Sequence, residues 1–65
     1  MSAEEFDSIA FTRRHVVRLM DGREYSIEAV DFEQREVKYY SESDFPHWVK
    51  LKRIAAVLKK EYDTT

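Results

Sequence analysis

Sixty-five residues make one domain, near the lower size limit for a chain that folds without a metal or a disulfide. Apolar residues make up 43% and aromatic residues 14%, too much for a disordered chain even though 37% of the residues are charged. The chain has no cysteine, which excludes a disulfide framework and a thiolate metal site, and its formal net charge is −2.

The charges are unevenly distributed along the chain. Residues 1–46 carry eleven acidic and six basic side chains, whereas residues 47–65 carry five basic and two acidic ones. A dedicated duplex-DNA binder usually has a strong basic excess, which this chain lacks. We therefore expect either a basic partner for the acidic part or only a local nucleic-acid patch.

Several classes of protein are not expected. The longest apolar run is five residues, at 54–58, which is too short for a membrane span. The segment Met1–Ala10 is acidic and has no apolar stretch typical of a secretory signal, so we expect a cytoplasmic protein. Neither His15 nor His47 lies in a cluster of ligand residues, so no metal and no cofactor are predicted.

A short amphipathic helix is predicted over residues 3–11. Ser2 and Glu5 have the spacing of a capping box, and Phe6 and Ile9 share one helical face. A helix of this length is not stable alone, so it must pack against the rest of the domain.

Antiparallel strands are predicted after the helix. Asp21-Gly22 indicates a tight hairpin turn in which both central residues have positive φ. The segment after it alternates between apolar and polar residues, which is typical of a half-buried strand. The first four predicted strands cover residues 15–20, 24–29, 37–40 and 48–52, with a loop at residues 41–46.

The last segment fits two structures. Ile54, Ala55 and Leu58 have helical spacing, whereas residues 55–60 also suit a strand. A turn at residues 52–54 followed by a fifth strand would close a small barrel and remove exposed edges, so the strand is favoured. The predicted fold is mainly β: a short N-terminal helix followed by a five-stranded antiparallel SH3/Sm-like small barrel, in a single domain of residues 1–65.

This order of elements resembles the Sm-like small barrel, and within that group the chain is similar to the Rof family of Rho-termination inhibitors. An acidic, aromatic start, Phe6 beside Asp7, precedes a valine-rich first strand. Four short segments follow in similar order: Leu19-Met20-Asp21-Gly22, Ala29-Val30-Asp31-Phe32, Val37-Lys38-Tyr39-Tyr40 and Leu51-Lys52-Arg53-Ile54. The spacing from helix to hairpin is shorter here, the loop at residues 41–46 has its own sequence, and the basic closing motif of Hfq-type RNA binders is not clearly present.

The leading hypothesis is a non-enzymatic protein that binds a nucleic-acid-binding protein and blocks its nucleic-acid site. The resemblance names a Rho-type terminator as that partner, and the acidic part of the chain would fit its basic surface. Capping and solubility explain the helix acids equally well, and Phe45 is interpreted slightly more readily as a lid on the core. The predicted partner-binding residues are Glu4, Glu5, Asp7, Glu42, Asp44 and Phe45.

The alternative is a small Sm-like RNA-binding module. Aromatic rings can stack on bases while lysine and arginine contact phosphate. Because consecutive strand residues face opposite sides, one of Tyr39 and Tyr40 must point outward, whereas Trp48 is expected in the core. The residues of this alternative are Tyr39, Tyr40, Trp48, Lys50, Lys52 and Arg53.

Catalysis is not expected. The chain has no nucleophile elbow, no P-loop, and no pairing of histidine and aspartate with metal spacing. His47 beside Trp48 is the candidate general base, but a lone histidine at the start of a strand is more often a surface residue.

Overall fold

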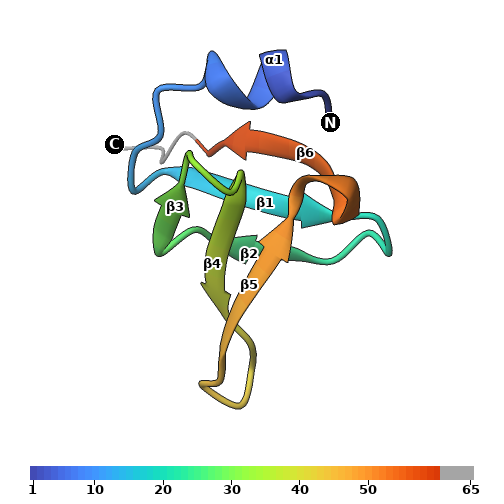
Figure 1. Ribbon diagram of the computed structural model, residues 1–65. Coiled ribbons are helices and arrows are strands. Elements are labelled where there is room, and N and C mark those ends of the chain that lie inside the picture. The colour runs from blue at the N-terminus through green and yellow to red at the C-terminus, as the bar shows by residue number, and fades with distance from the viewer. Residues whose placement is uncertain (61–65) are drawn as a thin grey trace.

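The computed structural model describes residues 1–60 as one short helix and six strands in two antiparallel sheets (Figure 1). The first sheet has the strand order β2-β1-β6 and the second β3-β4-β5. No helix in this part of the chain is long and apolar enough to cross a membrane. The elements are α1 (Ala3–Asp7), β1 (His15–Leu19), β2 (Glu24–Ser26), β3 (Ala29–Asp31), β4 (Glu36–Tyr40), β5 (Pro46–Lys50), the 3₁₀ turn η1 (Leu51–Arg53) and β6 (Ile54–Lys59).

The N-terminal helix is confirmed but ends earlier than predicted. The Ser2 hydroxyl accepts a hydrogen bond from the Glu5 N–H, as the capping box requires. At the other end, the Ser8 N–H donates to the carbonyl of Glu4, and its hydroxyl donates to the carbonyl of Glu5. These bonds cap the helix, which therefore ends at Asp7. Phe6 is the one buried residue of α1.

The predicted hairpin is present between β1 and β2, with a different turn. The Gly22 N–H donates to the Leu19 carbonyl, and the Leu19 N–H donates to the Arg23 carbonyl. Gly22 has φ 90°, whereas Asp21 does not have positive φ. The loop is therefore a three-residue turn with glycine in the left-handed region, and the prediction of two left-handed residues was wrong.

The single strand predicted at residues 24–29 is divided into β2 and β3. The Ile27 N–H still donates to the His15 carbonyl of β1, but the next N–H, of Glu28, donates to the Lys38 carbonyl of β4. The chain thus passes from the first sheet to the second at this point, which gives six strands instead of five.

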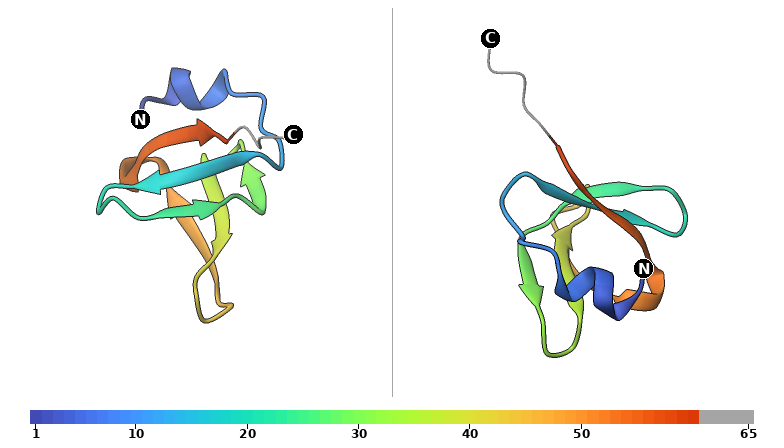
Figure 2. Two further views of the ribbon diagram at one scale, coloured as in Figure 1. Left: turned by 180° about the vertical axis from the view of Figure 1, so that it is seen from behind. Right: turned by 90° about the horizontal axis from the view of Figure 1, so that it is seen from above.

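The last segment is a strand, as predicted. After η1, β6 pairs antiparallel with β1, from His15 opposite Lys59 to Leu19 opposite Ile54, with one irregularity between Arg18 and Leu19. A helix over this segment is thereby excluded. The left view of Figure 2 shows β6 running alongside β1.

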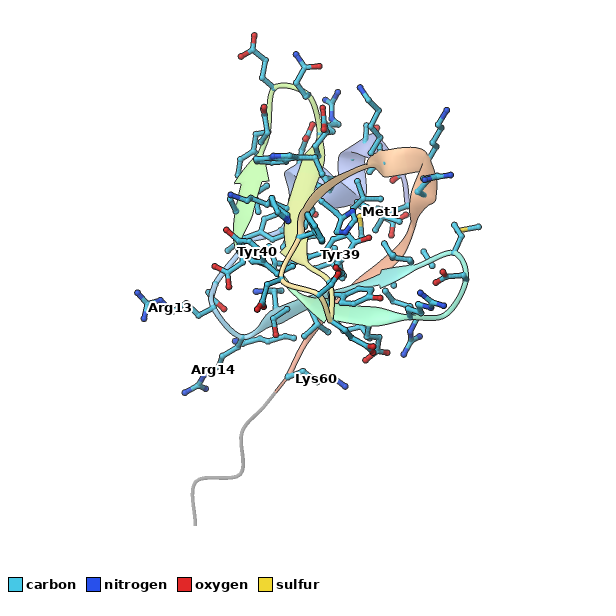
Figure 3. All side chains as sticks on the ribbon, turned by 90° about the horizontal axis from the view of Figure 1, so that it is seen from below. Met1, Arg13, Arg14, Tyr39, Tyr40 and Lys60 are labelled. Atoms are coloured by element: carbon cyan, nitrogen blue, oxygen red, sulfur yellow. The ribbon has the colours of Figure 1, made fainter. Side chains whose placement is uncertain are left out.

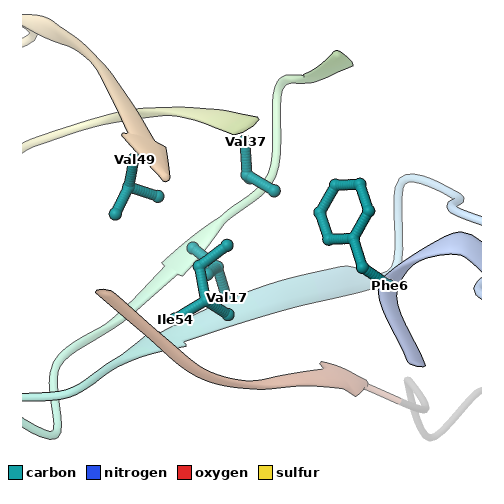
Figure 4. Packing of buried hydrophobic residues seen from close by; sticks show 5 residues of the cluster. All are labelled: Phe6, Val17, Val37, Val49 and Ile54. Carbon is teal, nitrogen blue, oxygen red and sulfur yellow. The ribbon is translucent and has the colours of Figure 1, made fainter. Parts of the chain in front are cut away.

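The core lies between the two sheets and is closed at one end by α1. Five fully or nearly fully buried side chains form it: Phe6, Val17, Val37, Val49 and Ile54 (Figure 4). They come from α1, β1, β4, β5 and β6, so every long element contributes one residue. In Figure 1, α1 lies at one end of the molecule and the loop between β4 and β5 at the other.

Candidate functional site: an acidic end and an aromatic face

The helix is tied to the turn between β3 and β4 by an ion pair. The Arg35 Nε and Nη2 atoms donate to the two carboxylate oxygens of Asp7 at 3.1 and 2.7 Å. Arg35 has φ 52°, a conformation that L residues other than Asn and Asp rarely adopt, and the bidentate pair is made from this strained position. The same guanidinium lowers the pKa of Asp7 below the ordinary value of an aspartate.

Aromatic rings join the same two segments. The ring of Phe6 lies 5.3 Å from that of Phe11 and 5.7 Å from that of Phe32, and Phe11 lies 5.6 Å from Phe32. Phe6 is fully buried, whereas Phe32 is 49% exposed. One part of the Phe32 ring therefore packs against Phe6 and Phe11, and the rest of the ring is exposed to solvent.

Acidic residues flank this half-exposed ring in the chain. Glu33 is exposed in the turn, and the half-buried Asp31 accepts hydrogen bonds from the Glu33 and Gln34 N–H groups at 2.9 and 3.0 Å. Together with the helix acids they form the acidic end, which has five carboxylates and one arginine. The acidic end consists of Glu4, Glu5, Asp7, Asp31, Phe32, Glu33 and Arg35.

The structure divides the partner-binding residues predicted from the sequence into two groups. Glu42, Asp44 and Phe45 lie in the β4–β5 loop, at the opposite end of the molecule from α1 (Figure 1). Phe45 is 65% exposed, so its interpretation as a lid on the core was wrong. The Ser41 N–H donates to the Phe45 carbonyl, which closes the loop without the Phe45 ring.

A second surface lies on the outer side of the β4–β5 pair. Lys38 is directly opposite Trp48 in the register, and Tyr40 and Lys50 lie two residues further along their strands, on the same side. Trp48 is 50% and Tyr40 42% exposed, so the expectation that Trp48 fills the core was wrong. We call Lys38, Tyr40, Trp48 and Lys50 the aromatic face.

Lysines accompany both rings of the aromatic face. The Lys38 Nζ lies 5.3 Å from the centre of the Tyr40 ring. The Lys50 Nζ lies 3.6 Å from a carboxylate oxygen of Glu36; the lysine side chain is exposed, whereas the Glu36 side chain is only 19% exposed. Lys38 has no ion-pair partner among residues 1–60.

Tyr39 points to the other side of β4 from Tyr40, as the alternation requires (Figure 3). Its ring stacks on Tyr25 at 4.4 Å and on His47 at 5.3 Å. Burial raises the pKa of the Tyr39 hydroxyl above the ordinary value of a tyrosine. Of the two tyrosines predicted as stacking platforms, only Tyr40 is on the aromatic face.

The predicted RNA-binding residues Lys52 and Arg53 are exposed on η1, beyond the end of β5. The Arg53 carbonyl accepts a hydrogen bond from the Met20 N–H, which joins η1 to the β1–β2 hairpin. These two bases therefore belong to the turn and not to the aromatic face.

The sequence reasoning missed a basic cluster at the start of β1. A hollow lined by Thr12, Arg13, Arg14 and Lys59 lies there, and the Lys60 N–H donates to the Arg14 carbonyl (Figure 3). The adjacent Arg13-Arg14 pair was the available signal, but only the pairing of β1 with β6 brings it beside Lys59.

Within residues 1–60, no group of three or more histidine, cysteine, aspartate or glutamate side chains is placed to hold a metal ion. His15 is buried, and its Nδ1 accepts a hydrogen bond from the Thr12 N–H at 2.9 Å. His47 stacks on Tyr39, with no carboxylate or hydroxyl partner recorded for its ring in the described chain.

No model of a known protein family matches the chain, and no curated protein or solved structure matches it either. Function is therefore proposed from the charge and geometry of the acidic end and the aromatic face.

Proposed function

We propose that the chain is a non-enzymatic binding protein whose acidic end docks on the basic, nucleic-acid-binding surface of a protein partner and excludes nucleic acid from it. The residue resemblance to the Rof family makes a Rho-type transcription terminator the named candidate. A cytoplasmic location fits both the candidate partner and a sequence without cysteine.

The observation that carries this proposal is the half-exposed ring of Phe32, which packs on Phe6 of the acidic helix α1 and stands between Asp31 and Glu33 in the chain. An apolar ring within a charged rim is a common composition of protein interfaces, in which the ring loses water and the rim sets orientation. Phe32 already packs on Phe6 and Phe11, so little side-chain freedom is lost when a partner covers it.

The acidic end is also held in one shape before binding. The Asp7–Arg35 pair and the three phenyl rings fix α1 against the β3–β4 turn, although the two segments are 28 residues apart in the sequence. Carboxylates in a fixed array can occupy positions on a basic surface that phosphates would otherwise take. Complementary charge of this kind speeds association and confers specificity more than it raises affinity.

We also propose that the two sheets are the two halves of one Sm-like small barrel. The support is the continuous chain from β2 to β3, which pairs first with β1 and then with β4. A strand that changes sheets in this way is how small barrels and orthogonal sandwiches turn their corners.

Two matched charge reversals test the docking surface. Glu4→Lys/Glu33→Lys changes the acidic end by four charge units and leaves the Asp7–Arg35 pair in place. Glu28→Lys/Glu42→Lys makes the same change in net charge at exposed residues elsewhere. We expect the first variant to bind purified Rho at least about tenfold more weakly at low salt, which is about 1.4 kcal/mol, and the second to bind like the wild type.

Affinity capture from bacterial lysate, with the same two variants, shows whether Rho or another protein is the partner. Equal loss of binding in both variants would mean that net charge alone matters and would overturn the assignment of the acidic end. Capture of RNA without any protein, by the wild type and by both variants, would overturn the proposed function itself.

A further inference from the structure

We propose that the aromatic face is a second binding surface, for single-stranded RNA, separate from the acidic end. The proposed function does not use this face, and the chemistry of its side chains differs from that of the acidic end. The inference rests on the exposure of its two rings, the position of its lysines, and the basic side chains next to it.

The two rings of the aromatic face are exposed on neighbouring paired strands. Tyr40 and Trp48 project from the outer side of β4 and β5, and Lys38 lies directly opposite Trp48 in the register. Large aromatic side chains that are half exposed in a domain with so small a core need a reason other than stability. Stacking on a base is one such reason, because every base presents a flat π-face to a ring.

The cations lie where phosphates of a stacked strand would pass. The Lys38 Nζ is 5.3 Å from the centre of the Tyr40 ring, so one ammonium lies beside an exposed aromatic face. Lys50 is two residues from Trp48 on the same side of β5, and its side chain is exposed, so its ammonium is accessible to a phosphate.

Further bases border the Tyr40 end of this face. Arg13 lines a hollow with Ile27, Glu28 and Val30, and the Glu28 N–H is hydrogen-bonded to the Lys38 carbonyl. The hollow that contains Arg14 and Lys59 lies next to it and shares Arg13. The opposing charges on and beside the face are Glu28, Glu36 and Asp31, and they are outnumbered by the basic side chains of Lys38, Lys50, Arg13, Arg14 and Lys59.

A single strand fits this face better than a duplex or a peptide. A duplex requires a broad basic surface, which a chain with a net charge of −2 does not offer. A peptide is usually held by pockets for its side chains, and the main hollows described in residues 1–60 are not lined by Tyr40 or Trp48. Flat exposed rings beside ammonium groups match base stacking with phosphate contact.

The fluorescence of Trp48 provides a direct readout, because it is the one tryptophan in the chain. The isolated protein is titrated with uridine and adenosine oligonucleotides of about 12 nucleotides, within the site sizes of single-strand binders. We expect quenching of Trp48 and a rise in the anisotropy of the labelled oligonucleotide. Affinity should fall steeply as salt is raised from about 20 to about 200 mM.

Three variants and a control identify the surface. Trp48→Ala and Tyr40→Ala should each weaken binding by about 5- to 150-fold, which corresponds to about 1–3 kcal/mol of base stacking. Lys38→Glu should weaken binding and reduce the salt dependence. Phe45→Ala removes an aromatic ring that is even more exposed, at the tip of the hairpin, and should leave binding unchanged.

Two results of the RNA titration would overturn the inference. One is an unchanged anisotropy at about 100 μM protein and low salt, the upper range of non-specific affinities. The other is an equal effect of Phe45→Ala and Trp48→Ala. A third outcome is that the wild type binds no RNA but captures a protein that the Trp48→Ala variant does not capture. That outcome would reject RNA and assign the aromatic face to a protein partner.

Failure of this inference is distinguishable from failure of the proposed function. The RNA titration contains no protein partner, so its outcome does not depend on the acidic end. Glu4→Lys/Glu33→Lys should lose Rho and keep RNA binding, whereas Trp48→Ala should lose RNA binding and keep Rho.

Discussion

Replacing Phe6 by alanine tests whether one side chain holds α1 and the acidic end in place. Phe6 is fully buried, is the one buried residue of α1, and contacts the rings of Phe11 and Phe32. A buried Phe→Ala change costs about 3–5 kcal/mol. A domain of this length has a total stability of about 3–10 kcal/mol, so the variant should lose a large part of it.

The measurement is urea denaturation followed by circular dichroism and by Trp48 fluorescence. Phe45→Ala is the matched control, because Phe45 is 65% exposed and should change the free energy of unfolding by less than about 0.5 kcal/mol. Phe6→Leu keeps an apolar side chain and should lose about 1–2 kcal/mol, so it remains measurable if Phe6→Ala does not fold. A loss below about 1 kcal/mol for Phe6→Ala would show that α1 is not held by this contact, and would refute the argument for a preformed acidic end.

Three further predictions concern single residues. Gly22→Ala should destabilise the hairpin by about 1–2 kcal/mol in thermal unfolding. Gly22 has φ 90°, and no neighbouring atom lies within 4 Å of the added methyl group, so the cost comes from the backbone conformation and not from a clash. An unchanged Tm would contradict this prediction. Arg35→Ala should raise the pKa of Asp7, measured by carboxyl NMR titration, because the Arg35 guanidinium lowers that pKa in the wild type. The stability that this pair gives the wild type is present above the ordinary aspartate pKa and is lost as the pH falls through the lowered pKa. An unchanged Asp7 titration would show that the pair does not form. Burial raises the pKa of Tyr39, so its contribution to stability is present below the ordinary tyrosine pKa and is lost as the pH rises through the raised pKa. Tyr39→Phe should therefore reduce the loss of stability at alkaline pH. An identical alkaline stability profile for the variant and the wild type would contradict this prediction.

The strands were predictable because their signals are local. Period-2 alternation marked the segments that became β2 and β5, a run of β-branched and apolar residues marked β1, and Asp21-Gly22 marked the hairpin between β1 and β2. The division of the second strand into β2 and β3 had no local signal, because it depends on Lys38 of β4 accepting a hydrogen bond from Glu28.

Trp48 was expected in the core, although the sequence contains a pattern that predicts its exposure. Trp48 and Lys50 share one side of β5 and Val49 has the other. Burying Trp48 would have taken the Lys50 ammonium toward the core, whereas burying Val49 leaves both lysine and tryptophan outside. The same reasoning applies to Lys38 and Tyr40 on β4.

The acidic end was only half predictable. The helix acids were identified from composition, but nothing local connects Asp7 with Arg35 across 28 residues. The fold brings them together because Phe6 and Phe32 pack on each other, and that contact depends on how α1 covers the core. Phe32, an apolar residue between Asp31 and Glu33, was the signal that could have identified the turn.

The acidic end and the aromatic face should influence each other through charge rather than through shape. Glu36, which pairs with Lys50 of the aromatic face, lies directly opposite Asp31 of the acidic end in the β3–β4 register, so the carboxylates of one surface should repel a phosphate strand that approaches the other. A basic partner on the acidic end neutralises these carboxylates and should strengthen RNA binding, and by linkage RNA should strengthen partner binding equally. The effect should be present at low salt and vanish at about 1 M, where the screening length is about 3 Å. RNA titration of the Glu4→Lys/Glu33→Lys variant measures it without a partner: this variant should bind RNA more tightly than the wild type at low salt, and equal affinities there would show that the two surfaces are electrostatically independent.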